Sequence, residues 1–160
     1  LLCIHSKKYI ETPPERKREK QQHNHKTMRV MKELLSEGGK CIYVAPSGGR
    51  DRRDESGVVQ VSSFDPQSLE MFYLMGRSAS NPTHFFPLAL NTYEILPPPS
   101  GIQTDLGEDR VMAFKAVGAF FGDELKLEEL ALTGNKQEIR LQRAKIIHQT
   151  VCNLYTQLKV

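Results

Sequence analysis

The chain of 160 residues contains no tryptophan and only three cysteines, Cys3, Cys41 and Cys152. An odd number of cysteines without C-x-x-C spacing argues against a disulfide framework and a zinc site, and favours a reducing, intracellular compartment. No stretch approaches the roughly 18 apolar residues that a membrane span needs. No charged-then-apolar leader opens the chain. We therefore expect a protein without bound metal that is neither secreted nor membrane-spanning.

The chain also lacks an initiator methionine, and its opening residues Leu1-Leu2-Cys3-Ile4 have the composition of a strand interior. This start predicts that the chain begins inside a larger fold. Its composition, 39% apolar and 26% charged, is ordinary for a soluble globular protein. A chain of this length buries roughly two-thirds of its unfolded surface, so we expect one domain or a large part of one.

Helical and strand-like patterns alternate along the sequence. We expect helices over residues 13–37, 65–75, 123–132 and about 24 residues from Ile139, and strands over 1–6, 41–45, 84–90 and 110–117. This alternation predicts the α/β class, with a layered sheet that carries helices on its faces. Residues 13–27 have no apolar side chain apart from two prolines, so this segment is either a polar, basic helix start or disordered.

Charge is distributed unevenly between the two parts of the chain. Residues 1–53 carry a net charge of +7, whereas residues 54–160 carry −4. The basic part attracts anions. Aromatic residues are sparse between Lys7 and Arg53, so the stacking platforms typical of nucleic-acid binding are missing and we expect no nucleic-acid partner.

The most informative segment is Ala45-Pro46-Ser47-Gly48-Gly49-Arg50-Asp51-Arg52. A proline ends the expected strand, two glycines allow a sharp turn, and two arginines follow at alternate positions. A glycine turn with paired guanidinium groups suits a phosphate-bearing small molecule. Gly-Arg loops are also ordinary surface turns, so the physics alone leaves both readings open. Ser47 lacks the G-x-S-x-G context of a nucleophile.

That segment, together with Ser6-Lys7-Lys8, Phe86-Pro87-Leu88-Ala89-Leu90 and Glu94-Ile95-Leu96-Pro97-Pro98-Pro99, resembles the soluble plastid-type glycerol-3-phosphate acyltransferases and their bacterial relatives. The resemblance implies that Lys8, Arg50 and Arg52 bind the substrate phosphate. Tyr9 is a further candidate contact, and Ser47, Gly48 and Gly49 form the supporting loop. Two residues depart from the family pattern: Tyr9 replaces a histidine and Arg53 replaces a proline.

The family's chemistry rests on a His-x4-Asp pair, in which the histidine is the general base on the glycerol hydroxyl. None of the five histidines has an aspartate five positions further on; they are His5, His23, His25, His84 and His148. The resemblance therefore implies that residues 1–160 are the C-terminal part of a single acyltransferase domain. We expect no catalytic residue in this chain, and no turnover by the chain alone.

The implied activity is acyl transfer from a thioester of acyl carrier protein or coenzyme A to glycerol 3-phosphate, giving lysophosphatidate, without cofactor or metal. The implied location is the bacterial cytoplasm or the plastid stroma. Two alternatives stay open: a lysophosphatidate acyltransferase, and a non-catalytic basic module that binds nucleic acid or acyl carrier protein. The basic segment also leaves docking of acyl carrier protein and peripheral contact with anionic lipid open.

Overall fold

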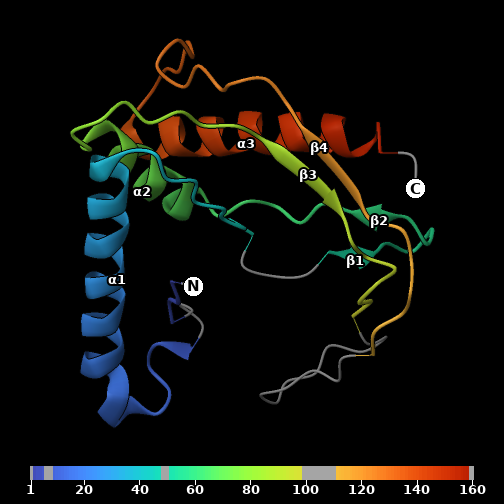
Figure 1. Ribbon diagram of the computed structural model, residues 1–160, viewed down its shortest axis with the longest axis horizontal. Coiled ribbons are helices and arrows are strands. Elements are labelled where there is room, and N and C mark those ends of the chain that lie inside the picture. Colours follow the sequence, from blue (N-terminus) through green and yellow to red (C-terminus); the bar gives the residue numbers. More distant parts are fainter. Residues whose placement is uncertain (1, 6–8, 48–50, 99–110, 159–160) are drawn as a thin grey trace. The chain divides into compact units, whose positions relative to one another are not determined.

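The computed structural model describes residues 2–5, 9–47, 51–98 and 111–158. These form two compact units, which are described separately below. The first comprises Leu1–Ala45 and Glu70–His84, and the second Pro46–Leu69 and Phe85–Val160. The elements in chain order are η2 (Pro14–Arg16), α1 (Lys17–Glu37), β1 (Arg52–Arg53), β2 (Val59–Gln60), α2 (Pro66–Arg77), β3 (Leu88–Asn91), β4 (Gly118–Phe121) and α3 (Lys136–Tyr155) (Figure 1).

Helix α1 dominates the first unit and ends where the glycine pair predicts. Gly38 adopts a φ of 75°, which side chains disfavour, and its N–H donates to the Leu35 carbonyl at 3.2 Å. The Asn81 side chain donates to the Ser36 carbonyl at 2.7 Å, so a second segment also satisfies this helix end. Met31 is buried, as the apolar stripe predicts. The predicted end of the helical segment at Glu37 is confirmed.

Residues 2–5 lie along α1 and form no strand, so the prediction of a strand over residues 1–6 is wrong for its described part. The Cys3 carbonyl accepts from Thr27 Oγ1 at 3.1 Å and lies 3.0 Å from His23 Nε2. Asn24 Oδ1 accepts from the His5 N–H at 2.8 Å, and Asn24 Nδ2 donates to the His5 carbonyl at 3.0 Å. Side chains of the helix therefore take the hydrogen bonds that a neighbouring strand would have provided.

Helix α2 follows the predicted start signal. The carboxylate of Asp65 accepts hydrogen bonds from the Ser68 N–H at 3.1 Å and the Ser68 hydroxyl at 2.5 Å, which identifies Asp65 as the N-cap. Tyr73 and Met75 are buried in the later turns, as the apolar spacing predicts.

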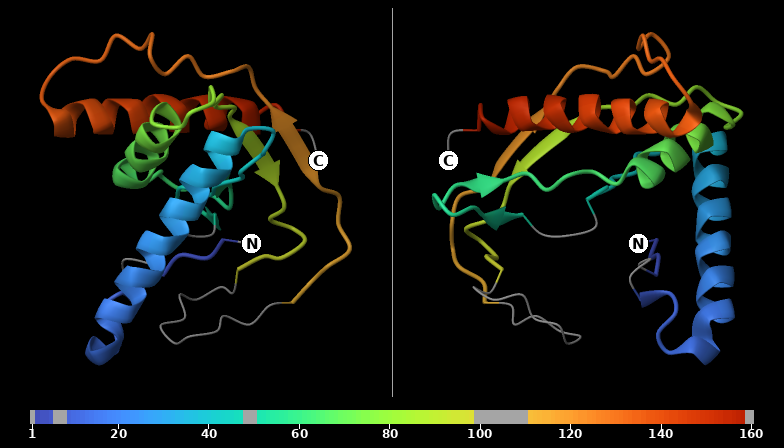
Figure 2. Two further views of the ribbon diagram at one scale, coloured as in Figure 1. Left: turned by 60° about the vertical axis from the view of Figure 1, so that its left-hand side comes forward. Right: turned by 180° about the vertical axis from the view of Figure 1, so that it is seen from behind.

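In the second unit, β3 and β4 pair antiparallel from Leu88 opposite Phe121 to Asn91 opposite Gly118. Helix α3 packs along this pair, as Figures 1 and 2 show. Gly122 lies against the Leu154 and Pro87 side chains, where an added Cβ would come within 3.0 Å of each. Pro87 directly precedes β3, which confirms its predicted place at a strand end.

Helix α3 has the clearest local signals. The Asn135 side chain accepts from the N–H groups of Gln137 and Glu138, and Glu138 accepts from the Asn135 N–H, which completes a capping box. The sequence spacing places Ile146, Ile147 and Val151 on one apolar face; Ile147 and Val151 are buried, but Ile146 is 40% exposed, so the prediction is wrong for Ile146.

Mixed helix and strand content is confirmed, but the described residues form two separate two-stranded antiparallel sheets rather than one layered sheet. Residues 41–45 form no strand, and Tyr43 is 63% exposed. Residues 111–117 are irregular because pairing begins only at Gly118, and residues 123–132 are irregular apart from a turn at 127–128, in place of the predicted helix. Apolar alternation marks a strand only where a partner strand supplies the hydrogen bonds.

Within the part of the chain that the structure describes, no helix combines the length and the apolar character that a membrane crossing requires.

Candidate functional site

The structure describes three of the seven residues expected at the phosphate site. Arg52 and Ser47 are half-buried, and Tyr9 is 39% exposed. Lys8, Gly48, Gly49 and Arg50 lie outside the described residues, so their predicted roles stay predictions. The surroundings of Arg52 and of Tyr9 are described in turn, because they belong to different units.

Arg52 lies in a small antiparallel hairpin formed by β1 and β2. It is paired with Gln60, and the neighbouring Arg53 is paired with Val59. Successive side chains of an extended strand point to opposite sides, so residues flanking Arg52 face away from it.

Asp51 fixes the loop that precedes Arg52. Its Oδ1 accepts a hydrogen bond from the Ser62 N–H at 2.8 Å. Burial raises the pKa of the Cys152 thiol and of the Tyr155 hydroxyl on α3, and the negative charge of Asp51 adds to both shifts. Asp51 therefore helps to hold the backbone that precedes Arg52.

Asp54 organises the turn of the hairpin. Its carboxylate accepts from the N–H groups of Ser56 and Val58 at 2.9 and 3.0 Å, from the Ser56 hydroxyl at 2.6 Å and from Gln60 Nε2 at 2.8 Å. These hydrogen bonds favour the ionised form, and they lower the pKa of Asp54 to about 2. Gly57 occupies the turn with a φ of 81°.

Arg53 is engaged with protein groups on three sides. Its Nη1 donates to the Gly57 carbonyl at 2.7 Å, and its Nη2 forms an ion pair with Glu94. The guanidinium carbon also lies 5.0 Å from the centre of the Tyr93 ring. This residue therefore ties the hairpin to the 93–94 turn.

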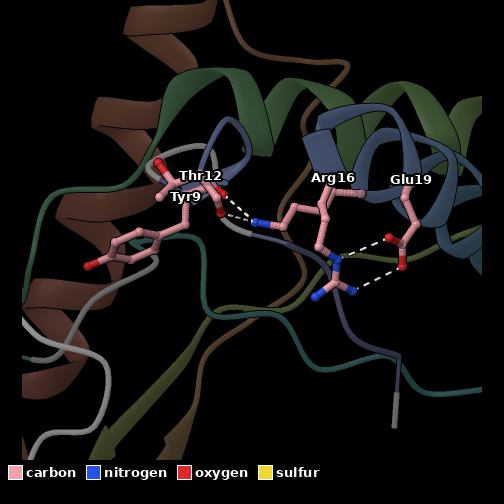
Figure 3. Close-up of polar contacts among 5 residues, drawn as sticks. Tyr9, Thr12, Arg16 and Glu19 are labelled. Atoms are coloured by element: carbon pink, nitrogen blue, oxygen red, sulfur yellow. Dashed lines mark hydrogen bonds and ion pairs between the residues drawn. The ribbon is translucent and has the colours of Figure 1, made fainter. Parts of the chain in front are cut away.

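The backbone of Tyr9 is held by a buried lysine. Lys20 on α1 is 8% exposed, and its ammonium donates to the Tyr9 carbonyl at 2.7 Å and to the Thr12 carbonyl. Figure 3 shows these two carbonyl oxygens beside the exposed Arg16–Glu19 ion pair. The Thr12 N–H also donates to the Tyr9 carbonyl at 3.3 Å, closing a turn. Lys20 thereby fixes the backbone directly after Lys8.

Sequence reasoning missed the roles of Lys20 and Asp54. Lys20 is one of many cations in a polar segment, and no local pattern distinguishes it. Asp54 carried a usable signal, since an aspartate followed closely by Ser56 and Gly57 is typical of a side chain that caps its own turn. Among the described residues, no three His, Cys, Asp or Glu side chains gather in a group suited to a metal ion.

The site combines a basic hairpin with acidic side chains that interact with neighbouring groups of the protein. Asp51 and Asp54 accept hydrogen bonds from neighbouring backbone groups, and Glu94 pairs with Arg53. Such an arrangement suits binding of an anion near Arg52.

Comparison with known proteins identifies relatives over nearly the whole chain. Glycerol-3-phosphate acyltransferase ATS12, chloroplastic, from Cucurbita moschata is 37% identical over 99% of this chain and 35% of the relative. The ATS11 protein of the same plant is 36% identical over 99% of this chain and 36% of the relative. Glycerol-3-phosphate acyltransferase, chloroplastic, from Spinacia oleracea is 35% identical over 99% of this chain and 34% of the relative.

The chain is a homologue of the chloroplastic glycerol-3-phosphate acyltransferases. The resemblance seen in the sequence motifs is thereby confirmed. The chain spans about a third of the length of these curated relatives. No protein-family model matches the chain.

Proposed function

We propose that the natural protein carrying this chain is a glycerol-3-phosphate 1-O-acyltransferase, and that this chain supplies its phosphate-binding part. Homology over 99% of the chain to proteins of that name carries the proposal. In the reaction, the substrate hydroxyl attacks the thioester carbonyl, an ester C–O bond forms and the C–S bond breaks. The hydroxyl proton ends on the leaving thiolate, and the product is lysophosphatidate.

The phosphate ligands in this proposal are Lys8, Arg50 and Arg52, with Tyr9 as a further hydrogen-bond donor. Each charge-assisted hydrogen bond to the phosphate is worth about 1.5–3 kcal/mol. Ser47, Gly48 and Gly49 form the turn that presents the arginines. The anchored positions of Asp51 and of the Arg52–Gln60 pair support this assignment, since both restrain the backbone on which the arginines are carried.

The general base and its partner aspartate come, in this proposal, from the part of the protein outside this chain. The sequence supports this, because no histidine here has the His-x4-Asp spacing. The chain would then be one portion of a single domain with the glycerolipid acyltransferase fold. The location in this proposal is the plastid stroma, which the chloroplastic names of the relatives support.

The acyl donor in this proposal is acyl carrier protein carrying a thioester-linked chain. A shallow hollow of about 440 Å³ on α1 is lined by Gln22, His25, Lys26 and Arg29. Two cations at a recess on an exposed helix complement a strongly acidic protein surface. A coenzyme A thioester, the other candidate donor, shares the reacting carbonyl but lacks such a surface.

The test is steady-state kinetics of the full-length enzyme with Arg52→Ala. We expect the KM for glycerol 3-phosphate to rise about tenfold or more, as loss of one charge-assisted hydrogen bond requires, while the acyl-donor KM stays within about twofold. Lys145→Ala, which removes an exposed cation of α3, is the control and should leave the glycerol 3-phosphate KM unchanged. Equal effects of Arg52→Ala on both substrates would remove the assignment.

A further inference from the structure

Residues 60–65 contact the arginine loop, residues 46–52, on both of its sides. Ser62 donates its N–H to Asp51 at 2.8 Å, and Asp65 donates its N–H to the Pro46 carbonyl at 3.1 Å. Just before them, Gln60 is paired with Arg52. The backbone on both sides of Gly48-Gly49-Arg50 is therefore hydrogen-bonded to one short segment.

That segment is itself held by a histidine of α3. His148 Nε2 lies 3.0 Å from the Val61 carbonyl oxygen, across a separation of 87 residues in the chain. A carbonyl only accepts, so Nε2 is the donor in this hydrogen bond. The imidazole also meets the Phe64 ring edge to face, with ring centres 5.1 Å apart and planes at 82°. The histidine thus contacts residues on both sides of Ser62.

Helix α3, which carries His148, is a rigid element of the second unit. It extends over 20 residues, begins with a complete capping box and packs on β3 and β4. Hydrogen bonding from a helix side chain transfers this rigidity to a segment that has little regular structure of its own. A small displacement of a binding group is enough to weaken substrate binding strongly.

We infer that His148 is a positioning residue for the phosphate-binding Arg52. His148 contacts Val61 and Phe64 and thereby restrains residues 60–65. These residues in turn contact Pro46, Asp51 and Arg52. The inference rests on the proposed function for its consequence in catalysis. The contact chain itself is independent of that function.

Two variants at this position separate the hydrogen bond from the ring packing. His148→Phe keeps an aromatic ring against Phe64 but has no donor for Val61. His148→Gln places an amide N–H close to the position of Nε2. In the full-length enzyme we expect His148→Phe to raise the glycerol 3-phosphate KM about fivefold to tenfold, the size of one neutral hydrogen bond. The kcat and the acyl-donor KM should stay within about twofold.

His148→Gln should bring the glycerol 3-phosphate KM back to within about twofold of the wild-type value. Lys145→Ala, on the exposed side of the same helix, is the matched control and should have no effect. An unchanged KM in His148→Phe, or a loss that glutamine fails to rescue, would overturn the inference.

Amide hydrogen exchange gives a second readout that needs no activity. The Ser62 amide should exchange faster in His148→Phe and return to the wild-type rate in His148→Gln. If the wild-type enzyme showed no thioester cleavage dependent on glycerol 3-phosphate, the proposed function would fail. The Ser62 exchange rates would then still decide whether His148 anchors this segment, and equal rates in all three proteins would refute it.

Discussion

At the scale of single residues, Arg52 and Arg53 show how neighbours of one type acquire different roles. The Arg53 guanidinium is occupied by Glu94, the Gly57 carbonyl and the Tyr93 ring. Its charge is therefore balanced within the scaffold. Arg52 follows Asp51 and stands opposite Gln60 on the adjacent strand.

Replacing Lys20 tests how much its hydrogen bonds stabilise the first unit. Lys20→Met keeps the aliphatic stem but leaves the Tyr9 and Thr12 carbonyls without their ammonium donor. We expect the free energy of unfolding to fall by about 1.5–3 kcal/mol, the range for hydrogen bonds to a charged group. Urea-induced unfolding of the full-length protein measures this change.

Lys17→Met is the matched control for Lys20. Lys17 lies one turn earlier on α1, and its ion pair with Glu11 is exposed. An exposed pair contributes little, so this variant should change the free energy of unfolding by no more than about 0.5 kcal/mol. Similar losses of unfolding free energy in the two variants would show that burial of Lys20 does not increase its contribution to stability.

At the scale of elements, strands and helices differ in how they are stabilised here. Helices α2 and α3 carry their own caps, in Asp65 and Asn135. The β1–β2 hairpin has only two residues in each strand. It depends instead on side chains, chiefly on the carboxylate of Asp54 in its turn.

The hairpin should consequently respond to acid through Asp54. Its pKa is depressed from 3.8 to about 2, so the ionised carboxylate supports the turn fully above about pH 4. That support is lost as the pH falls toward about 2. Carboxyl ¹³C shifts of labelled aspartate measure the midpoint, and Asp54→Asn identifies the signal by removing it. A midpoint near 3.8 would show that these hydrogen bonds do not persist in solution.

At the scale of the whole molecule, the net charge of +7 on residues 1–53 is the dominant feature. Long-range attraction of this kind raises association rates and weakens with ionic strength. Under the proposed function it acts on an acidic donor protein and on the phosphate of the small substrate. Reversing one charge on α1 separates these two effects.

Lys26→Glu should lower kcat/KM for acyl carrier protein thioesters about fivefold at low salt, with the difference shrinking as salt is added. The kcat/KM for the matching coenzyme A thioester should remain within about twofold, because Lys26 lines the α1 hollow rather than the arginine loop. Lys145→Glu on α3 is the charge-matched control. Parallel losses for both donors would contradict a docking surface on α1.

The sequence by itself determined the helices with strong local signals. Gly38 ends α1, Asp65 begins α2, and the apolar spacing places Ile147 and Val151 on the buried side of α3. The sequence also showed the family resemblance, through short motifs that follow one another in the expected order. These features are local, because helix hydrogen bonds and caps join residues within a few positions of one another.

Only the tertiary structure decided which apolar segments became strands. Residues 41–45 and 111–117 have strand-like composition but are irregular, whereas Gly118–Phe121 pairs with Leu88–Asn91. The supports of Tyr9 and of the arginine loop were hidden for the same reason, since Lys20 acts on a carbonyl 11 residues away and His148 on one 87 residues away. A strand or a buried polar contact exists only when a distant partner supplies its hydrogen bond, and periodicity within one segment does not specify that partner.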